Sequence, residues 1–264
     1  MHRRRDTSEH RLRPDRSAAL ALAAAVLLNC APLPAQSDPA GEAFDTEGSG
    51  VDVSGTLSFT SDYRFRGISQ TDIAPAIQPS LQIDTAAGFF AGVWGSNVSD
   101  FNGATTEIDL SAGWGGTLGA FDTSFGVLAY LFPGGRGTDI VELFGTAGFT
   151  LGPASATLGL NWAPEQANLD RANRYAHATV SAAIPGKALR LRASLGHETG
   201  GLPLRRSAGT AGKWDWQLGA DITLPSLTIG VAYVGTDLPS RDAQGNRANR
   251  LGRDGVVLKL SAFF

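Results

Sequence analysis

The strongest constraint in this sequence is a two-residue alternation of apolar and polar side chains that begins at Val51 and recurs to the C-terminus. In the segment 51–67, VDVSGTLSFTSDYRFRG, apolar residues take most odd positions and polar or charged residues take the even ones. Successive side chains of a strand point to opposite faces, so this segment is predicted to be a strand with one apolar and one polar face. Helical spacing is nearly absent after residue 50, which indicates an all-β chain.

The alternation divides the chain into about twelve strands separated by turn signals. After 51–67 they are predicted at 77–85, 88–97, 105–114, 119–131, 139–151, 154–162, 173–184, 188–197, 212–224, 226–235 and 255–264. The connections alternate in length. Tight joins such as GP and PGK follow the even strands, and longer ones such as VSDFNGAT and APEQANLDRA follow the odd strands.

Short turns at one end and long loops at the other are typical of an outer-membrane barrel with an even number of strands. The last strand, GVVLKLSAFF, also ends in an aromatic residue on its apolar face. Many apolar faces end in Trp, Tyr or Phe, and several polar faces carry charges near their middle. We therefore predict a transmembrane antiparallel up-and-down β-barrel of about 12 strands, apolar outside and polar inside. A soluble β-sandwich with the apolar faces inward is the alternative.

The N-terminus has the pattern of an export signal. Residues 1–16 carry six Arg, and residues 17–28 form an apolar run too short to span a membrane, followed by small residues around Ala35. We predict a signal peptide at 1–35, a flexible lead-in at 36–50 and the barrel at 51–264. Without residues 1–35, 16 basic and 22 acidic residues remain, a formal net charge of −6. This balance argues against nucleic-acid binding.

Five blocks carry a family resemblance: SDYRFRGISQTDIAPAIQ (61–78), FFAGVWGSNV (89–98), EIDLSAGWGG (107–116), VELFGTAG (141–148) and the C-terminal stretch 233–264. Together they resemble the TorF family of porin-like outer-membrane proteins, over nearly all of the chain after the signal. The resemblance implies a pore-forming barrel whose first strand contributes Asp62, Arg64 and Arg66. It also matches the family's acidic position in the strand 139–151 to Glu142. The solute is not implied.

Strand phase predicts which charged side chains line the interior and set selectivity. They are Asp62, Arg64, Arg66, Glu107, Asp109, Glu142, Arg190, Arg192, Lys213 and Asp215. Opposed charges across a lumen filter ions, but Arg64 and Arg66 could instead form structural salt bridges with Glu107, Asp109 or Glu142. Six inward bases against nine inward acids, counted over the whole barrel, favour a mild cation preference as a hypothesis.

The apolar faces predict a girdle at the membrane interface. Its expected members are Tyr63, Phe65, Trp114, Trp162, Trp214, Trp216 and Phe264, whereas the phase of Trp94 could place it inside. The expected partners are outer-membrane lipid, small hydrophilic solutes and the barrel-assembly machinery, the last through the strand ending in Phe264. No cofactor or metal is expected, because the polar loops have no metal-ligand spacing.

The predicted function is passive diffusion of small hydrophilic solutes or ions through an outer-membrane, porin-like channel. A barrel with a closed lumen and a structural or adhesive role is the alternative. A surface barrel enzyme is less favoured, because the chain after the signal has only His177 and His197 and no nucleophile motif. His197 beside Glu198 is the one pair that catalysis could use.

Overall fold

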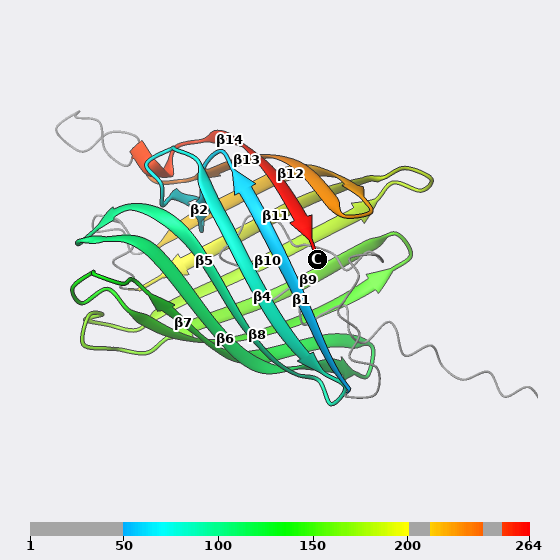
Figure 1. Ribbon diagram of the computed structural model, residues 1–264, viewed down its shortest axis with the longest axis horizontal. Coiled ribbons are helices and arrows are strands. Elements are labelled where there is room, and N and C mark those ends of the chain that lie inside the picture. The colour runs from blue at the N-terminus through cyan, green and yellow to red at the C-terminus, as the bar shows by residue number, and fades with distance from the viewer. Residues whose placement is uncertain (1–49, 201–211, 240–249) are drawn as a thin grey trace, which may run out of the picture.

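The computed structural model describes residues 50–200, 212–239 and 250–264. The predicted signal peptide and almost all of the lead-in lie outside the described residues. Within these ranges the chain is almost entirely β-structure (Figure 1). None of the described helices is both long enough and apolar enough to cross a membrane.

Twelve antiparallel strands of the described residues close into one barrel, as predicted. Going around the wall, each strand pairs with its neighbour in the chain, and β1 pairs with β14 to close the ring. The strands are β1 (Val51–Thr60), β4 (Ala76–Thr85), β5 (Phe89–Phe101), β6 (Ala104–Leu118), β7 (Phe121–Leu131), β8 (Ile140–Leu151), β9 (Ala154–Ala163), β10 (Asn173–Ala183), β11 (Leu189–Thr199), β12 (Lys213–Leu224), β13 (Leu227–Thr236) and β14 (Gly255–Phe263).

Closure removes the free strand edges, so the wall's backbone groups pair with one another. At the seam, the backbones of Phe264 and Gly55 exchange two hydrogen bonds of 2.7 and 3.0 Å. Gly55 has no side chain, and the ring of Phe264 occupies the place where a Cβ would lie. The C-terminal aromatic residue therefore completes the barrel seam.

The apolar faces of the strands point outward. Leu158 is 67% exposed, Phe149 50% and Ile222 48%, whereas Glu142 is fully buried. A sandwich would bury its apolar faces between two sheets, and this barrel does the reverse. The soluble sandwich alternative is therefore wrong.

The first strand is shorter than predicted, because β1 ends at Thr60 and not at residue 67. Residues 61–75, here called the inner hairpin, leave the wall; residues 62–71 fold into the barrel and are buried, whereas 72–75 are exposed. They contain the two-residue strands β2 (Arg64–Phe65) and β3 (Ile68–Ser69), which pair with each other. Alternation continues through 61–67 because a hairpin inside the lumen has the same two-residue period as the wall.

One connection also differs from its prediction. The segment VSDFNGAT was expected as a long loop, but β5 and β6 extend through it and leave only Asn102–Gly103 as the turn. Both residues have positive φ, 51° and 100°, which suits a tight hairpin. The barrel end with the inner hairpin and the 132–139 and 164–172 connections is called the loop end, and the opposite end is the turn end.

Candidate functional site: the barrel interior

The inner hairpin turns sharply at Arg66 and Gly67. Their φ values are 47° and 80°, and they join Phe65 to its cross-strand partner Ile68. Positive φ at both central residues defines the turns that fit the right-handed twist of a two-residue hairpin. Glycine adopts this conformation freely, but an arginine costs about 1–2 kcal/mol there, so surrounding contacts must offset it.

The contacts of Arg66 supply that compensation. Its Nη2 lies 2.6 Å from Glu142 Oε2 on β8, and its Nη1 lies 2.7 Å from Glu198 Oε1 on β11. The guanidinium carbon stands 4.3 Å from the centre of the Tyr175 ring and 4.7 Å from that of Phe65. Burial lowers the pKa of Arg66, but the two carboxylates more than offset this, so its pKa is raised well above the ordinary value.

Lys213 of β12 joins the same network. Its ammonium donates a 2.8 Å hydrogen bond to the backbone oxygen of Arg66. It also lies 3.1 Å from Glu198 and 3.3 Å from Asp215. The turn of the inner hairpin is thus held by β8, β10, β11 and β12.

Arg64 anchors the hairpin in another direction. Its Nε pairs with Asp62 at 2.5 Å, and its Nη1 donates to the backbone oxygens of Gly67, Leu251 and Arg253 at 2.8–3.1 Å. Leu251 lies in the short 3-10 helix η4 (Arg250–Gly252), which precedes β14. Arg64 therefore ties the hairpin to the segment leading into the last strand.

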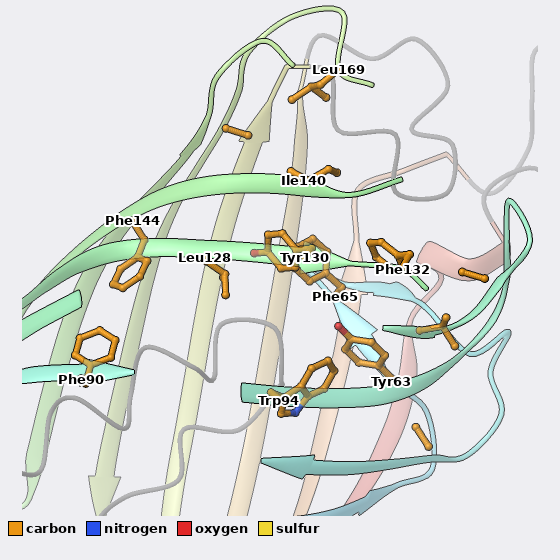
Figure 2. Close-up of a cluster of buried hydrophobic side chains, with 14 residues drawn as sticks. Tyr63, Phe65, Phe90, Trp94, Leu128, Tyr130, Phe132, Ile140, Phe144 and Leu169 are labelled. Carbon is orange, nitrogen blue, oxygen red and sulfur yellow. The ribbon is translucent and has the colours of Figure 1, made fainter. Parts of the chain in front are cut away.

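The aromatic residues of the hairpin face the opposite wall (Figure 2). The Tyr63 ring packs edge-on against Trp94 of β5 with centroids 5.2 Å apart, and Phe65 packs against Tyr130 of β7 at 5.6 Å. Tyr63 is 0% exposed and Phe65 is 4% exposed. The prediction that Tyr63 and Phe65 belong to the outer girdle is therefore wrong, because the chain turns inward after Thr60 and carries both rings with it.

The barrel interior is filled where the inner hairpin lies. At this level every strand except β11 contributes an inward residue that is at most 7% exposed: Thr60, Gln78, Trp94, Glu107, Tyr130, Glu142, Asn161, Tyr175, Asp215, Val234 and Val257. The β11 residue is Glu198, with a side chain 12% exposed. A water-filled channel would leave its lining exposed, so the described residues close the loop-end half of the barrel in this conformation.

Several inward side chains of the turn-end half are only half-buried, among them Thr56, Ser80, Thr157, Thr179 and Ser181. Others there are buried, including Ser124 and the ion pair of Arg192 with Asp221. Several aromatic side chains lie flat along the wall over glycines. The Phe90 and Phe144 rings occupy the space that a Cβ on Gly113 and Gly126 would need. The two ring centroids lie 6.3 Å apart, so the rings from β5 and β8 meet over these glycines.

All the predicted interior residues point into the barrel. Arg190 is half-buried and Arg192 is buried, both nearer the turn end. The other eight are buried in the loop-end half: Asp62, Arg64, Arg66, Glu107, Asp109, Glu142, Lys213 and Asp215. Arg192 pairs with Asp221, and Arg190 donates a 3.2 Å hydrogen bond to Ser181. Sequence reasoning missed Glu198 as an interior residue. Its phase with Arg190 and Arg192 on the same strand would have identified it.

On the outer surface, Trp162, Trp214 and Phe264 are 40%, 45% and 55% exposed, and Trp114 and Trp216 are half-buried. The Nε1 of Trp114 donates a 2.9 Å hydrogen bond to the backbone oxygen of Ala87. Trp94 lies inside at 6% exposure.

The histidines do not form the pair that the enzyme alternative needs. The His197 ring packs on Trp214 with centroids 4.3 Å apart, while Glu198 binds Arg66 inside the barrel. Adjacent residues of a strand face opposite sides, which separates the two side chains. His177 stacks on Tyr175. Among the described residues, no three His, Cys, Asp or Glu side chains are grouped as metal ligands.

A closed antiparallel barrel with an apolar exterior and a polar interior defines a porin-like fold. The chain belongs to the family described as "Bacterial protein of unknown function (Gcw_chp)", which matches residues 45–264. No curated protein matches it.

Solved porins share this fold. The NanC porin aligns with a TM-score of 0.54 and 9% identity, covering 80% of this chain and 99% of the porin. The KdgM porin aligns with a TM-score of 0.52 and 6% identity, covering 80% of this chain and 97% of the porin. At such identity the likeness concerns the fold alone.

Proposed function

We propose that this protein is a porin-like channel of the outer membrane for small hydrophilic solutes, as its resemblance to the TorF family implies. The observation that carries the proposal is the reversed polarity of the barrel. Its wall exposes large apolar side chains such as Leu158 at 67%, while polar residues face the interior. Only lipid makes an exposed apolar band favourable, and only a closed barrel satisfies its backbone there.

The location follows from the same proposal. The export signal at 1–35 would direct the chain through the inner membrane and be removed. Phe264, which closes the seam against Gly55, would be the terminal residue that the assembly machinery engages. Trp114, Trp162, Trp214, Trp216 and Phe264 would anchor the wall at the membrane interfaces.

Single-channel recording of the purified protein in planar lipid bilayers tests the proposal. We expect discrete conductance steps, with long closed periods because the inner hairpin fills the loop-end half. Verified insertion without any conductance step, over a range of salt concentrations and voltages, would overturn the channel proposal.

The contacts of Arg64 and Arg66 favour their structural role over an ion-filtering one. Each guanidinium is already bound to a carboxylate, and together they tie the hairpin to three wall strands and to the segment before β14. Selectivity would then depend on charges of the turn-end half. The cation preference stays a prediction, and the reversal potential in a salt gradient measures it.

A barrel with a permanently closed lumen is the second candidate function. The filled loop-end half favours it, because the inner hairpin makes both ionic and aromatic contacts with the wall. Such a protein would serve the envelope through its surface loops. The bilayer recordings separate the candidates, since a permanently closed barrel inserts without conducting.

A further inference from the structure

A second cluster of cationic side chains lies inside the barrel, on β11 and β14. Arg190 and Arg192 point inward from β11, and Lys259 points inward from β14. The register places Lys259 opposite Gly230 of β13, Gly230 opposite Asp221 of β12, and Asp221 opposite Arg190. Neighbouring strands are about 4.8 Å apart, so these residues form one continuous row across the wall.

Of the two buried cations of this cluster, Arg192 and Lys259, only Arg192 forms an ion pair with Asp221. Asp221 forms its ion pair with Arg192, whose Nε and Nη2 both donate to it. The Lys259 ammonium has no hydrogen bond or ion pair among the described residues, although Lys259 is only 6% exposed. One carboxylate thus stands beside two buried cations, and a buried charge without a counter-charge is unfavourable.

The wall between the two cations is lined by small residues. The inward positions of β13 at this height are Gly230 and Ala232, and Gly219 of β12 lies under the Arg192 guanidinium, whose Nη2 is 2.9 Å from where a Cβ would be. No large side chain of β13 therefore stands between the two cations at this height.

We propose that Lys259 and Arg192, beside Asp221, form a binding site for the oxyanion group of a small solute, a carboxylate or a phosphate. The oxyanion would supply the counter-charge that the buried ammonium lacks, and the ammonium would donate a charge-assisted hydrogen bond to it. The positive charge of Arg192 would add to the attraction. The Ser58 and Ser261 hydroxyls, hydrogen-bonded to each other at 2.8 Å, lie on the same side of the interior and complete a polar surround. The inference rests on the proposed function only in that solutes enter the barrel.

Titration calorimetry of the protein in non-ionic detergent micelles tests the site, with inorganic phosphate and acetate as probes and chloride as the reference anion. We expect at least one oxyanion to bind more tightly than chloride. The variant Lys259→Gln should weaken it by about tenfold or more, equivalent to about 1.4 kcal/mol. Lys259→Arg should retain binding, because it keeps the charge.

The variant Asp221→Asn gives the opposite expectation. It removes the competing carboxylate, so the oxyanion should bind more tightly than to the unaltered protein. If neither oxyanion binds more tightly than chloride, or if Lys259→Gln and Asp221→Asn leave the affinity unchanged in folded protein, the proposal is wrong. Equilibrium binding needs no conductance, so this result is independent of the bilayer test of the channel.

Discussion

Arg66 links the inner hairpin to three wall strands at once, through Glu142 on β8, Tyr175 on β10 and Glu198 on β11. Its side chain is 2% exposed. Breaking a buried ion pair by removing one partner leaves an uncompensated charge, whereas an exposed pair contributes little. This contrast gives Arg66 a measurable role in stability.

We expect Arg66→Gln to lower the free energy of unfolding by about 3–5 kcal/mol, because Glu142 and Glu198 lose their shared partner. Urea unfolding in detergent micelles measures the change. Arg250→Gln is the matched control, since its ion pair with Asp72 is half exposed on both sides. That control should cost less than about 1 kcal/mol. Equal losses in the two variants would contradict the structural role of Arg66.

At the scale of an element, the inner hairpin depends on the space around its turn. A Cβ on Gly67 would lie 2.4 Å from the Thr236 side chain and 2.9 Å from the backbone oxygen of Gly235. Gly67 also has a φ of 80°, which other residues rarely adopt. The hairpin can therefore approach β13 only with glycine at this position.

Gly67→Ala should displace the hairpin from the wall, at a cost of about 1–3 kcal/mol from the close contact. Limited trypsin digestion after Arg64 and Arg66 reports the displacement as faster cleavage. Gly119→Ala is the control, because Gly119 has a similar φ of 65° but no atom within 4 Å of the added Cβ. Unchanged cleavage in Gly67→Ala would show that the hairpin is not seated against β13.

The register allows the whole inner hairpin to be removed. Thr60 and Ala76 are cross-strand partners at the ends of β1 and β4, so a four-residue turn can replace residues 61–75 without changing the pairing. We expect the shortened barrel to conduct several times more than the full protein in planar bilayers, because the loop-end half loses its filling. Equal conductance would mean that the permeation path does not pass the hairpin.

At the scale of the whole molecule, the wall separates an apolar outside from a polar inside. Leu158 and Thr157 are neighbours on β9 with opposite orientations, Leu158 being 67% exposed and Thr157 half-buried toward the interior. The same substitution at these two positions therefore compares the cost of a charge on the outer face with its cost on the inner face of one strand.

Leu158→Arg should destabilise the barrel in lipid vesicles by about 2–4 kcal/mol if the residue lies near the bilayer midplane. Thr157→Arg should cost much less, because its charge enters a polar interior. The heat-dependent shift of the folded band in gel electrophoresis, followed against urea, measures both. A larger loss of stability in Thr157→Arg than in Leu158→Arg would contradict the assignment of the Leu158 face to lipid.

The barrel and its polarity were predictable from the sequence, because the two-residue period of segments such as 212–224 and 255–264 determines which side chains share a face. The strand count followed from turn residues between these segments. Local patterns of this kind need no knowledge of distant contacts.

The tertiary structure alone decided what residues 61–75 do. Their alternation is the same in the wall and in an inward hairpin, so only the contacts of Arg66 with Glu142 and Glu198, 76 and 132 positions away, distinguish the two. For the same reason, the sequence could not predict that Asp221 pairs with Arg192 and not with Lys259. Strand phase predicts that a charge points inward, but register and packing across neighbouring strands determine which charges meet.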